Sequence, residues 1–148
     1  SDVVTKAVYD EEFVVVVPTG HELAAQKAID PAQLASHQVL LLGEGHCFRD
    51  QVLEACSGLQ QAIRDGHAKG QAVVEGSSLE TLKHMVASGL GITVLPKTAA
   101  EVTSYEAGAL QVRPFLDPAP RRTIALAWRA SYPRPQAIDT LAAAVTTP

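Results

Sequence analysis

A chain of 148 residues is long enough for one domain that buries about two thirds of the surface of its unfolded chain. Its balance of 12 basic and 16 acidic residues fits a soluble globular protein and argues against nucleic-acid binding through a basic face. No apolar run reaches the length of a membrane span, and the opening residues lack the positive and apolar regions of a signal peptide, so we expect a cytoplasmic protein.

Apolar runs and turn residues predict alternating strands and helices along the chain. Strands are expected at residues 12–17, 38–42, 71–74, 92–95, 110–112 and 121–128. Helices are expected at residues 31–35, from residue 47 onward, from residue 77 to the stop at Gly89, at 97–102 and at 135–145. This alternation predicts an α/β fold with a mostly parallel, doubly wound sheet. Residues 1–11 show little periodicity, and the start at Ser1 suggests a piece of a longer protein.

Both cysteines of the chain lie within residues 43–58. Glycines interrupt an apolar strand there, and good helix formers begin at Cys47, so we predict a strand, a glycine turn and a helix in succession. Cys47 would then stand in the first helical turn, where unpaired N–H groups and the helix dipole favour a thiolate. His46 and Arg49 add positive character, and Asp50 is an acceptor that could orient either of them. The local sequence therefore indicates a nucleophilic thiol.

Cys56 follows Cys47 by nine residues. In an unbroken helix this spacing means a rise of about 13.5 Å and side chains on opposite faces. A disulfide needs Cα atoms about 4.4–6.8 Å apart, so the two cysteines can bond only if the segment between them unwinds. The alternative is that Cys56 is a small buried hydrophobic residue and Cys47 an ordinary loop thiol. In a cytoplasmic protein, two cysteines favour a catalytic, metal-binding or redox role over a structural disulfide.

Two features follow the second cysteine. Residues 57–70 are polar, contain three glycines and are expected to form a loop. Further on, Ser77 and Glu80 have the spacing of a capping box for the next helix. A helix start beside a strand end is also where α/β domains bind small ligands, so Ser77 and Ser78 are candidate effector contacts as well as caps.

The most specific motif is the run Gly-His-Cys-Phe-Arg-Asp-Gln at residues 45–51, with Cys56 following nine residues after the first cysteine. Less specific motifs lie at residues 78–82, 85–89, 91–96 and 121–124. Together they resemble the regulatory domain of the OxyR group, the peroxide-sensing branch of the LysR-type transcriptional regulators. The resemblance extends from about Phe13 to the C-terminus, and residues 57–70 are longer than the corresponding part of that pattern.

This resemblance implies the periplasmic-binding-protein architecture, in which crossover strands join two α/β subdomains. Residues 13–116 would form the second subdomain, and residues 121–148 would be the returning part of the first. Residues 1–148 would then be a fragment of a redox-sensing regulatory domain, without the DNA-binding domain.

The resemblance also implies a regulator that senses hydrogen peroxide and is not an enzyme. Its Cys47 would be oxidised to a sulfenic acid and would condense with Cys56 to a disulfide. The side chains implied around the peroxide or the thiolate are His46, Arg49, Asp50 and Arg122. Arg122 is also a candidate by itself, because a guanidinium stabilises a nearby thiolate; its alternative role is a salt bridge on a strand.

By the same resemblance, the partners are hydrogen peroxide, thiol reductants such as glutaredoxin or thioredoxin, and further copies of the chain. Regulatory domains would pair as dimers within a tetramer of the full-length protein. DNA would be bound only through the N-terminal domain, no membrane is involved, and no cofactor is expected.

Three other functions stay open. A LysR effector domain that binds a small organic ligand would leave the cysteines incidental and would be indifferent to peroxide. A thiol peroxidase is disfavoured because the thioredoxin-fold motifs and a Cys-x-x-Cys pair are absent from the sequence. A metal site built from His46, Cys47, Cys56 and His67 fits no standard zinc spacing, so no metal is expected.

Overall fold

The computed structural model describes residues 2–64, 74–101 and 108–146. The chain divides into two compact units. The large unit consists of Glu12–Pro120, and the small unit consists of Ser1–Glu11 together with Arg121–Pro148.

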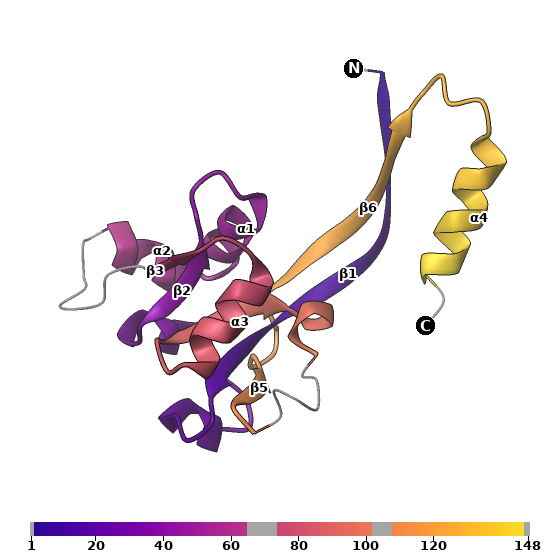
Figure 1. The fold of residues 1–148 in the computed structure, drawn as a ribbon. Coiled ribbons are helices and arrows are strands. Elements are labelled where there is room, and N and C mark those ends of the chain that lie inside the picture. The colour runs from indigo at the N-terminus through magenta and orange to yellow at the C-terminus, as the bar shows by residue number, and fades with distance from the viewer. Residues whose placement is uncertain (1, 65–73, 102–107, 147–148) are drawn as a thin grey trace. The chain divides into compact units, whose positions relative to one another are not determined.

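Strands and helices alternate along most of the chain (Figure 1). The described strands are β1 (Val3–Pro18), β2 (Val39–Leu42), β3 (Val74–Gly76), β4 (Ile92–Pro96), β5 (Leu110–Pro114) and β6 (Arg121–Arg129). The α-helices are α1 (Cys47–Ala55), α2 (Ser57–Arg64), α3 (Leu79–Ala87) and α4 (Pro135–Thr146). Three 3-10 helices accompany them: η1 (Glu22–Ala25), η2 (Pro31–Ser36) and η3 (Lys97–Ala100).

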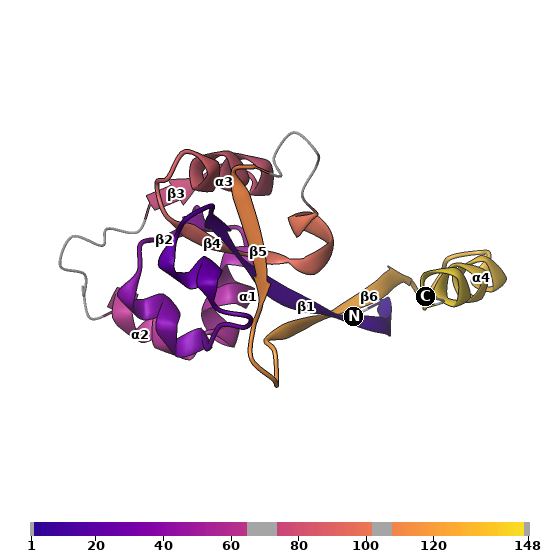
Figure 2. The same cartoon turned by 90° about the horizontal axis from the view of Figure 1, so that it is seen from below.

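The sheet of the large unit has the strand order β3-β2-β4-β1-β5. β2 pairs in parallel with both β3 and β4, whereas β1 runs antiparallel to β4 and β5. All four residues of β2 are buried, as expected for an apolar strand covered on both faces. Figure 2 shows α3 on one side of this sheet and α1 with α2 on the other. The predicted α/β class is confirmed. The strand that leads to the first cysteine, β2, has a parallel neighbour on each side.

Packing on the sheet fixes the position of α1. Phe48 of α1 and Phe13 of β1 meet edge to face, with ring centroids 5.4 Å apart. Val52, one helical turn further along α1, is 1% exposed. Two buried apolar side chains on the same face therefore hold α1 against the core.

α2 continues almost directly from α1 and packs against both α1 and η2. Its Leu59 is buried in the same core. η2 has a complete capping box, because the Asp30 carboxylate accepts from the backbone N–H of Gln33 while the Gln33 side chain accepts from the N–H of Asp30. The Asp30 carboxylate also accepts from the N–H of Ala32. The predicted proline-started helix is thus confirmed, and it supports a neighbouring helix that the sequence did not predict.

The small unit contains the first half of β1, which pairs with β6, and the helix α4. Along β6 every second residue is exposed, and the residues between them are half-buried. This is the pattern of a strand with one solvent-exposed face. Thr123 Oγ1 donates to the Asp10 carboxylate at 2.8 Å, which links the two strands by side chains as well.

Several predicted ends and one predicted loop were wrong. Residues 57–64 form α2 rather than a loop, and residues 3–11 belong to β1 although their sequence has little periodicity. The segment expected as a helix at 97–102 is a single 3-10 turn that ends at Ala100. The described part of the strand expected at 71–74 runs from Val74 to Gly76, and residues 71–73 lie outside the described part of the chain.

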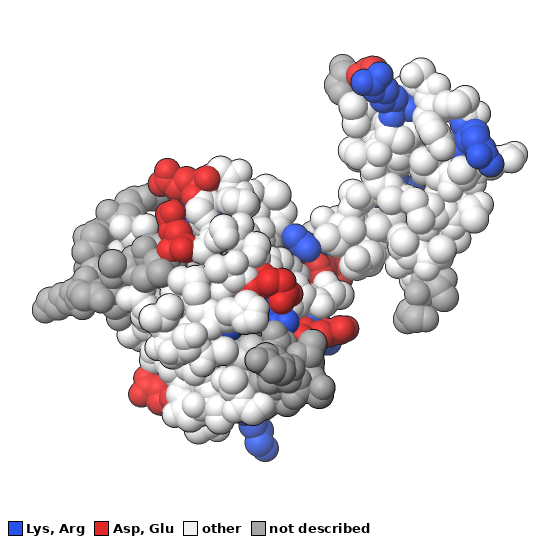
Figure 3. All heavy atoms as spheres, in the orientation of Figure 1, with Lys and Arg blue, Asp and Glu red and all other residues white. Residues whose placement is uncertain are grey.

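Acidic side chains cover more of the large unit than basic ones on the face shown in Figure 3. This agrees with the excess of acidic residues in the whole sequence. None of the helices in the described part of the chain has the length and apolar character needed to cross a membrane.

Candidate functional site

The turn between β2 and α1 places Cys47 at the start of a helix. β2 ends at Leu42, and Gly45 then takes a φ of +93°, a conformation that residues with a Cβ rarely adopt. His46 is the N-cap residue of α1 with extended backbone angles, and its side chain makes no capping hydrogen bond. Cys47 is the first residue of α1 and is an exposed free thiol. The predicted strand, glycine turn and helix are confirmed.

Cys56 occupies the other end of the same helix. It is the C-cap residue of α1, and its backbone N–H donates to the Val52 carbonyl at 2.9 Å. The thiol is a free cysteine with 1% exposure, and burial raises its pKa to about 11. A thiol in this environment stays protonated at neutral pH and is out of reach of reagents in solution.

An unbroken helix separates the two sulfurs. α1 comprises nine residues, which corresponds to a length of about 13.5 Å at 1.5 Å per residue. The conformation described here is therefore one in which Cys47 and Cys56 cannot bond directly, as the spacing predicted.

The predicted neighbours of Cys47 point in different directions. His46 and Asp50 are exposed in the first turn of α1, together with Cys47. Arg49 is 8% exposed, and its Nη1 donates to the Leu42 carbonyl at 2.9 Å and to Glu75 Oε1 at 3.2 Å. The Arg49 guanidinium thus binds the last residue of β2 and the side chain of the middle residue of β3. A role for these side chains in tuning the thiolate stays a prediction.

Arg122 belongs to the small unit and lies on β6. Its Nε and Nη2 donate to Glu11 Oε1 at 3.1 and 2.9 Å, and the Glu11 side chain is 5% exposed. The salt bridge on a strand, which the sequence left open as the alternative for Arg122, is thus present. Its predicted part in a peroxide pocket stays a prediction.

The serines before α3 act differently from the prediction. Ser78, not Ser77, is the N-cap residue, and its Oγ accepts from the N–H of Thr81 at 3.1 Å. The hydroxyls of both serines lie within 3.5 Å of Thr81 Oγ1. The capping box expected between Ser77 and Glu80 was wrong, because the helix begins one residue later and Thr81 takes the third helical position. Contact of either serine with an effector stays a prediction.

Two charged partners were missed by sequence reasoning: Glu75, which binds Arg49, and Glu11, which binds Arg122. Each lies in a different part of the sequence from its partner, 26 and 111 residues away. No local motif marks either glutamate, so only the strand pairing could have identified them.

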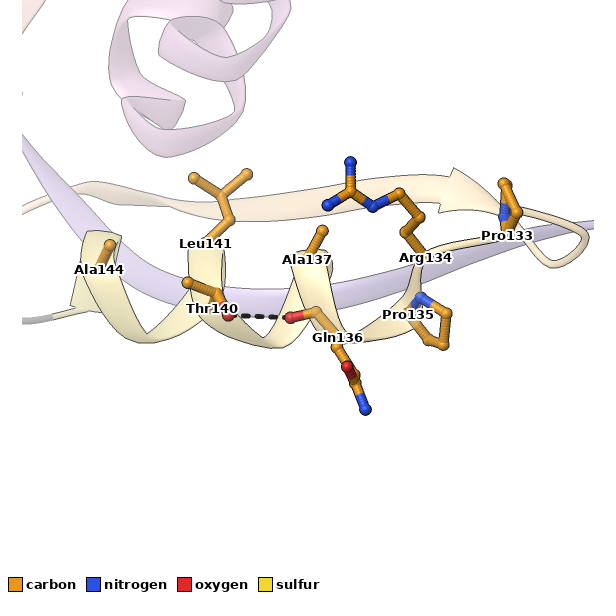
Figure 4. A pocket seen from close by; sticks show the side chains of 8 residues that line it. All are labelled: Pro133, Arg134, Pro135, Gln136, Ala137, Thr140, Leu141 and Ala144. Carbon is orange, nitrogen blue, oxygen red and sulfur yellow. Dashed lines mark hydrogen bonds between the residues drawn. The ribbon is translucent and has the colours of Figure 1, made fainter.

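An open groove of about 860 Å³ runs along α4 (Figure 4). Its lining comes from α4 and the two residues before it: Pro133, Arg134, Pro135, Gln136, Ala137, Thr140, Leu141 and Ala144. None of the predicted site residues is among them.

Within the described residues, no group of three or more histidine, cysteine or acidic side chains is arranged to hold a metal ion. His67, one of the residues considered for a metal site, lies outside the described residues.

Comparison with known proteins gives a consistent result. Residues 1–147 match the family model described as "LysR substrate binding domain". A "Probable hydrogen peroxide-inducible genes activator" of Streptomyces viridosporus is 41% identical over 143 residues, which are 97% of this chain and 44% of that protein. The "DNA-binding transcriptional dual regulator OxyR" of Escherichia coli is 35% identical over 137 residues, which are 93% of this chain and 42% of that protein.

Solved structures agree with the sequence relatives. The reduced form of the OxyR regulatory domain from Pseudomonas aeruginosa has a TM-score of 0.83 and 50% identity, over 99% of this chain and 66% of that one. A reduced form of OxyR from N. meningitidis has a TM-score of 0.84 and 42% identity, again over 99% of this chain and 66% of that one. The chain spans less than half the length of these two curated relatives. From the match of residues 1–147 and from these relatives, the chain belongs to the family of LysR substrate-binding domains.

Proposed function

We propose that this chain is the hydrogen-peroxide-sensing part of a LysR-type transcription regulator of the OxyR kind. The observation that carries the proposal is the placement of its two thiols at opposite ends of α1, one exposed at the first position and one buried at the C-cap. A single exposed thiol at a helix start can react with a small oxidant, while the buried thiol is protected until the helix opens. The names of the relatives support peroxide as the signal.

The proposed reaction has two steps. The Cys47 thiolate attacks one oxygen of hydrogen peroxide, the O–O bond breaks, and hydroxide leaves, so that Cys47 becomes a sulfenic acid. The Cys56 thiol then attacks the sulfenic sulfur, an S–S bond forms, and the oxygen leaves as water. Hydrogen peroxide is reduced by two electrons in total, and these come from the two thiols. A thiol reductant such as glutaredoxin or thioredoxin would return both cysteines to the state described here.

The output would be transcriptional rather than catalytic. In the longer regulator, DNA would be bound by an N-terminal domain outside this sequence, and regulatory domains would associate as dimers within a tetramer. A regulator that acts on DNA in a bacterial cell works in the cytoplasm, which is the location we propose.

A thiol count before and after one equivalent of peroxide tests the proposal. The protein should fall from two free thiols to none, with the mass of an intramolecular disulfide. Cys47→Ser should retain its single thiol, whereas Cys56→Ser should yield a sulfenic acid that dimedone traps. Two thiols remaining after peroxide would refute the sensor function, and dimedone adducts on Cys56 in the Cys47→Ser protein would reverse the assignment of the two cysteines.

A further inference from the structure

Arg49 ties three elements together beneath the reactive end of α1. It is the third residue of α1, and its Nη1 donates both to the carbonyl of Leu42, the last residue of β2, and to the carboxylate of Glu75 on β3. The Arg49 side chain is 10% exposed, and that of Glu75 is 48% exposed. A nearly buried guanidinium needs a counter-charge, and Glu75 supplies one.

The Glu75 carboxylate also lies over the turn that precedes Cys47. A Cβ placed on Gly43 would be 3.5 Å from Glu75 Oε2, and the backbone N–H of Gly43 donates to the carbonyl of Gly76 at 3.3 Å. The turn before α1 is therefore tied to β3 by one backbone hydrogen bond, and α1 itself is tied to β3 by one ion pair. β3 lies at the end of the strand order, and its half-exposed Glu75 side chain meets the nearly buried Arg49 side chain there.

We propose that Glu75 and Arg49 form a latch that holds α1 in its helical position and so sets how easily the buried Cys56 becomes available to oxidised Cys47. Neither residue of the latch touches the reacting sulfur or oxygen atoms in this role, so both are positioning residues. The inference rests on the proposed function for its redox consequence, but the latch itself concerns the thiol form of the protein.

The direction of the effect follows from which state contains the latch. The disulfide can form only after α1 unwinds, and unwinding separates Arg49 from Leu42 and Glu75. The latch therefore stabilises the dithiol form relative to the disulfide form. Weakening the latch should raise the equilibrium constant for disulfide formation and should expose Cys56 more often.

The first experiment measures that equilibrium constant. The wild type, Glu75→Gln and the control Glu54→Gln are equilibrated with defined ratios of reduced and oxidised dithiothreitol, and the Cys47–Cys56 disulfide is quantified by mass after quenching. Glu54 is an exposed acidic residue on α1, so its variant removes the same charge from the same helix. We expect a rise of about threefold for Glu75→Gln, the size of a partly exposed ion pair, and no change for the control.

A double-variant cycle separates the latch from a general charge effect. Arg49→Met removes the guanidinium and keeps an unbranched apolar side chain, and Glu75→Gln in that background should then have no further effect. An equal rise for Glu54→Gln, or a full effect of Glu75→Gln without Arg49, would overturn the latch.

The second experiment needs no peroxide chemistry. In the fully reduced protein, alkylation of Cys56 reports how often α1 and its surroundings open, because this thiol is 1% exposed. Glu75→Gln should raise that rate about threefold, and Glu75→Asp, which keeps the charge, should restore part of the protection. If the wild type formed no Cys47–Cys56 disulfide with peroxide, the proposed sensor function would be refuted. The alkylation rates of Cys56 would then be the test of whether Glu75 and Arg49 hold α1 in place. Equal rates in wild type and Glu75→Gln would refute it.

Discussion

Cys47 begins the helix that Cys56 ends: the first is the N1 residue of α1 and the second is its C-cap. One thiol is exposed, and the other is buried in the core at the junction of α1 and α2. The same helix therefore gives the two cysteines opposite chemical environments, and this difference can be measured.

Selective alkylation is the first expected consequence. At pH 8, iodoacetamide should modify Cys47 readily and Cys56 very slowly, because burial shields Cys56 and raises its pKa from 9.0 to about 11. At that pH its thiolate fraction is about a hundredfold below that of an ordinary thiol. Peptide mapping after brief labelling is the measurement, and equal labelling of both cysteines in the native protein would contradict the described burial.

Oxidation should remodel residues 46–58 and leave the sheet intact. Formation of a Cys47–Cys56 disulfide breaks helical hydrogen bonds and removes the packing of Phe48. The stabilisation that a disulfide provides, about 2–4 kcal/mol, is comparable with that loss. Hydrogen exchange should become faster at residues 46–58 after peroxide, with little change in β4 and β6. Unchanged protection at 46–58, with the intramolecular disulfide confirmed by mass, would mean that no unwinding is needed.

Stability should fall as the pH drops below about 6.5. Burial lowers the pKa of His21, repulsion from His37 lowers it further, and Glu22 opposes both. The folded state therefore binds fewer protons than the unfolded state in this range, so the stabilising contribution is complete above the unfolded pKa and is lost as the pH falls towards the folded one.

Urea unfolding between pH 7.5 and 5 measures this slope, and His21→Asn is the matched variant. His21 Nδ1 accepts from the N–H of Leu23 at 3.1 Å, and the Asn carbonyl can accept the same hydrogen bond but does not titrate. The variant should lose stability less steeply with falling pH. A slope equal to that of the wild type would assign the pH effect to other groups.

Because Ser78, and not Ser77, caps α3, substitution of these two neighbouring serines should affect stability differently. Ser78→Ala should lower the free energy of unfolding by about 1 kcal/mol, because it removes the acceptor for the Thr81 N–H. Ser77→Ala should change it by less than about 0.5 kcal/mol. Denaturant titration of both variants is the test, and the reverse order would restore the capping box expected from the sequence.

The ion pair between Arg122 and Glu11 should contribute to the stability of the small unit. Arg122→Met should cost about 1–3 kcal/mol, because it leaves the nearly buried Glu11 carboxylate without this guanidinium. Glu11→Gln in the Arg122→Met background should recover part of that loss. Additive losses in the double variant would show that the two residues act independently.

Local sequence was sufficient where an element carries its own start and stop signals. α1 follows a glycine turn, η2 has an Asp-Pro start, and α3 ends where Gly89 takes a φ of +81°. α2 was missed because its Ser57-Gly58 start, directly after another helix, has the composition of a loop. Its helical form depends on packing against η2, which lies more than 20 residues earlier in the chain.

In the candidate site, too, the features that depend on local sequence were predicted, and those that depend on distant residues were not. The placement of Cys47 and Cys56 follows from the ten consecutive residues 47–56, so their spacing was enough. The direction of the Arg49 side chain depends on Glu75, which reaches it only through the pairing of β3 with β2. Likewise, the first half of β1 has an irregular, exposed sequence, and its conformation comes from pairing with the distant β6.

Gly45 limits how this site can vary among related sequences. Its φ of +93° lies outside the region that most residues occupy in a Ramachandran plot, yet an added Cβ would meet no atom within 4 Å. For a Cβ, the restriction at this position is therefore one of backbone conformation and not of contact with a neighbouring atom. Asn and Asp are the replacements that natural variation can best tolerate there, whereas Val, Ile and Thr are effectively closed to it.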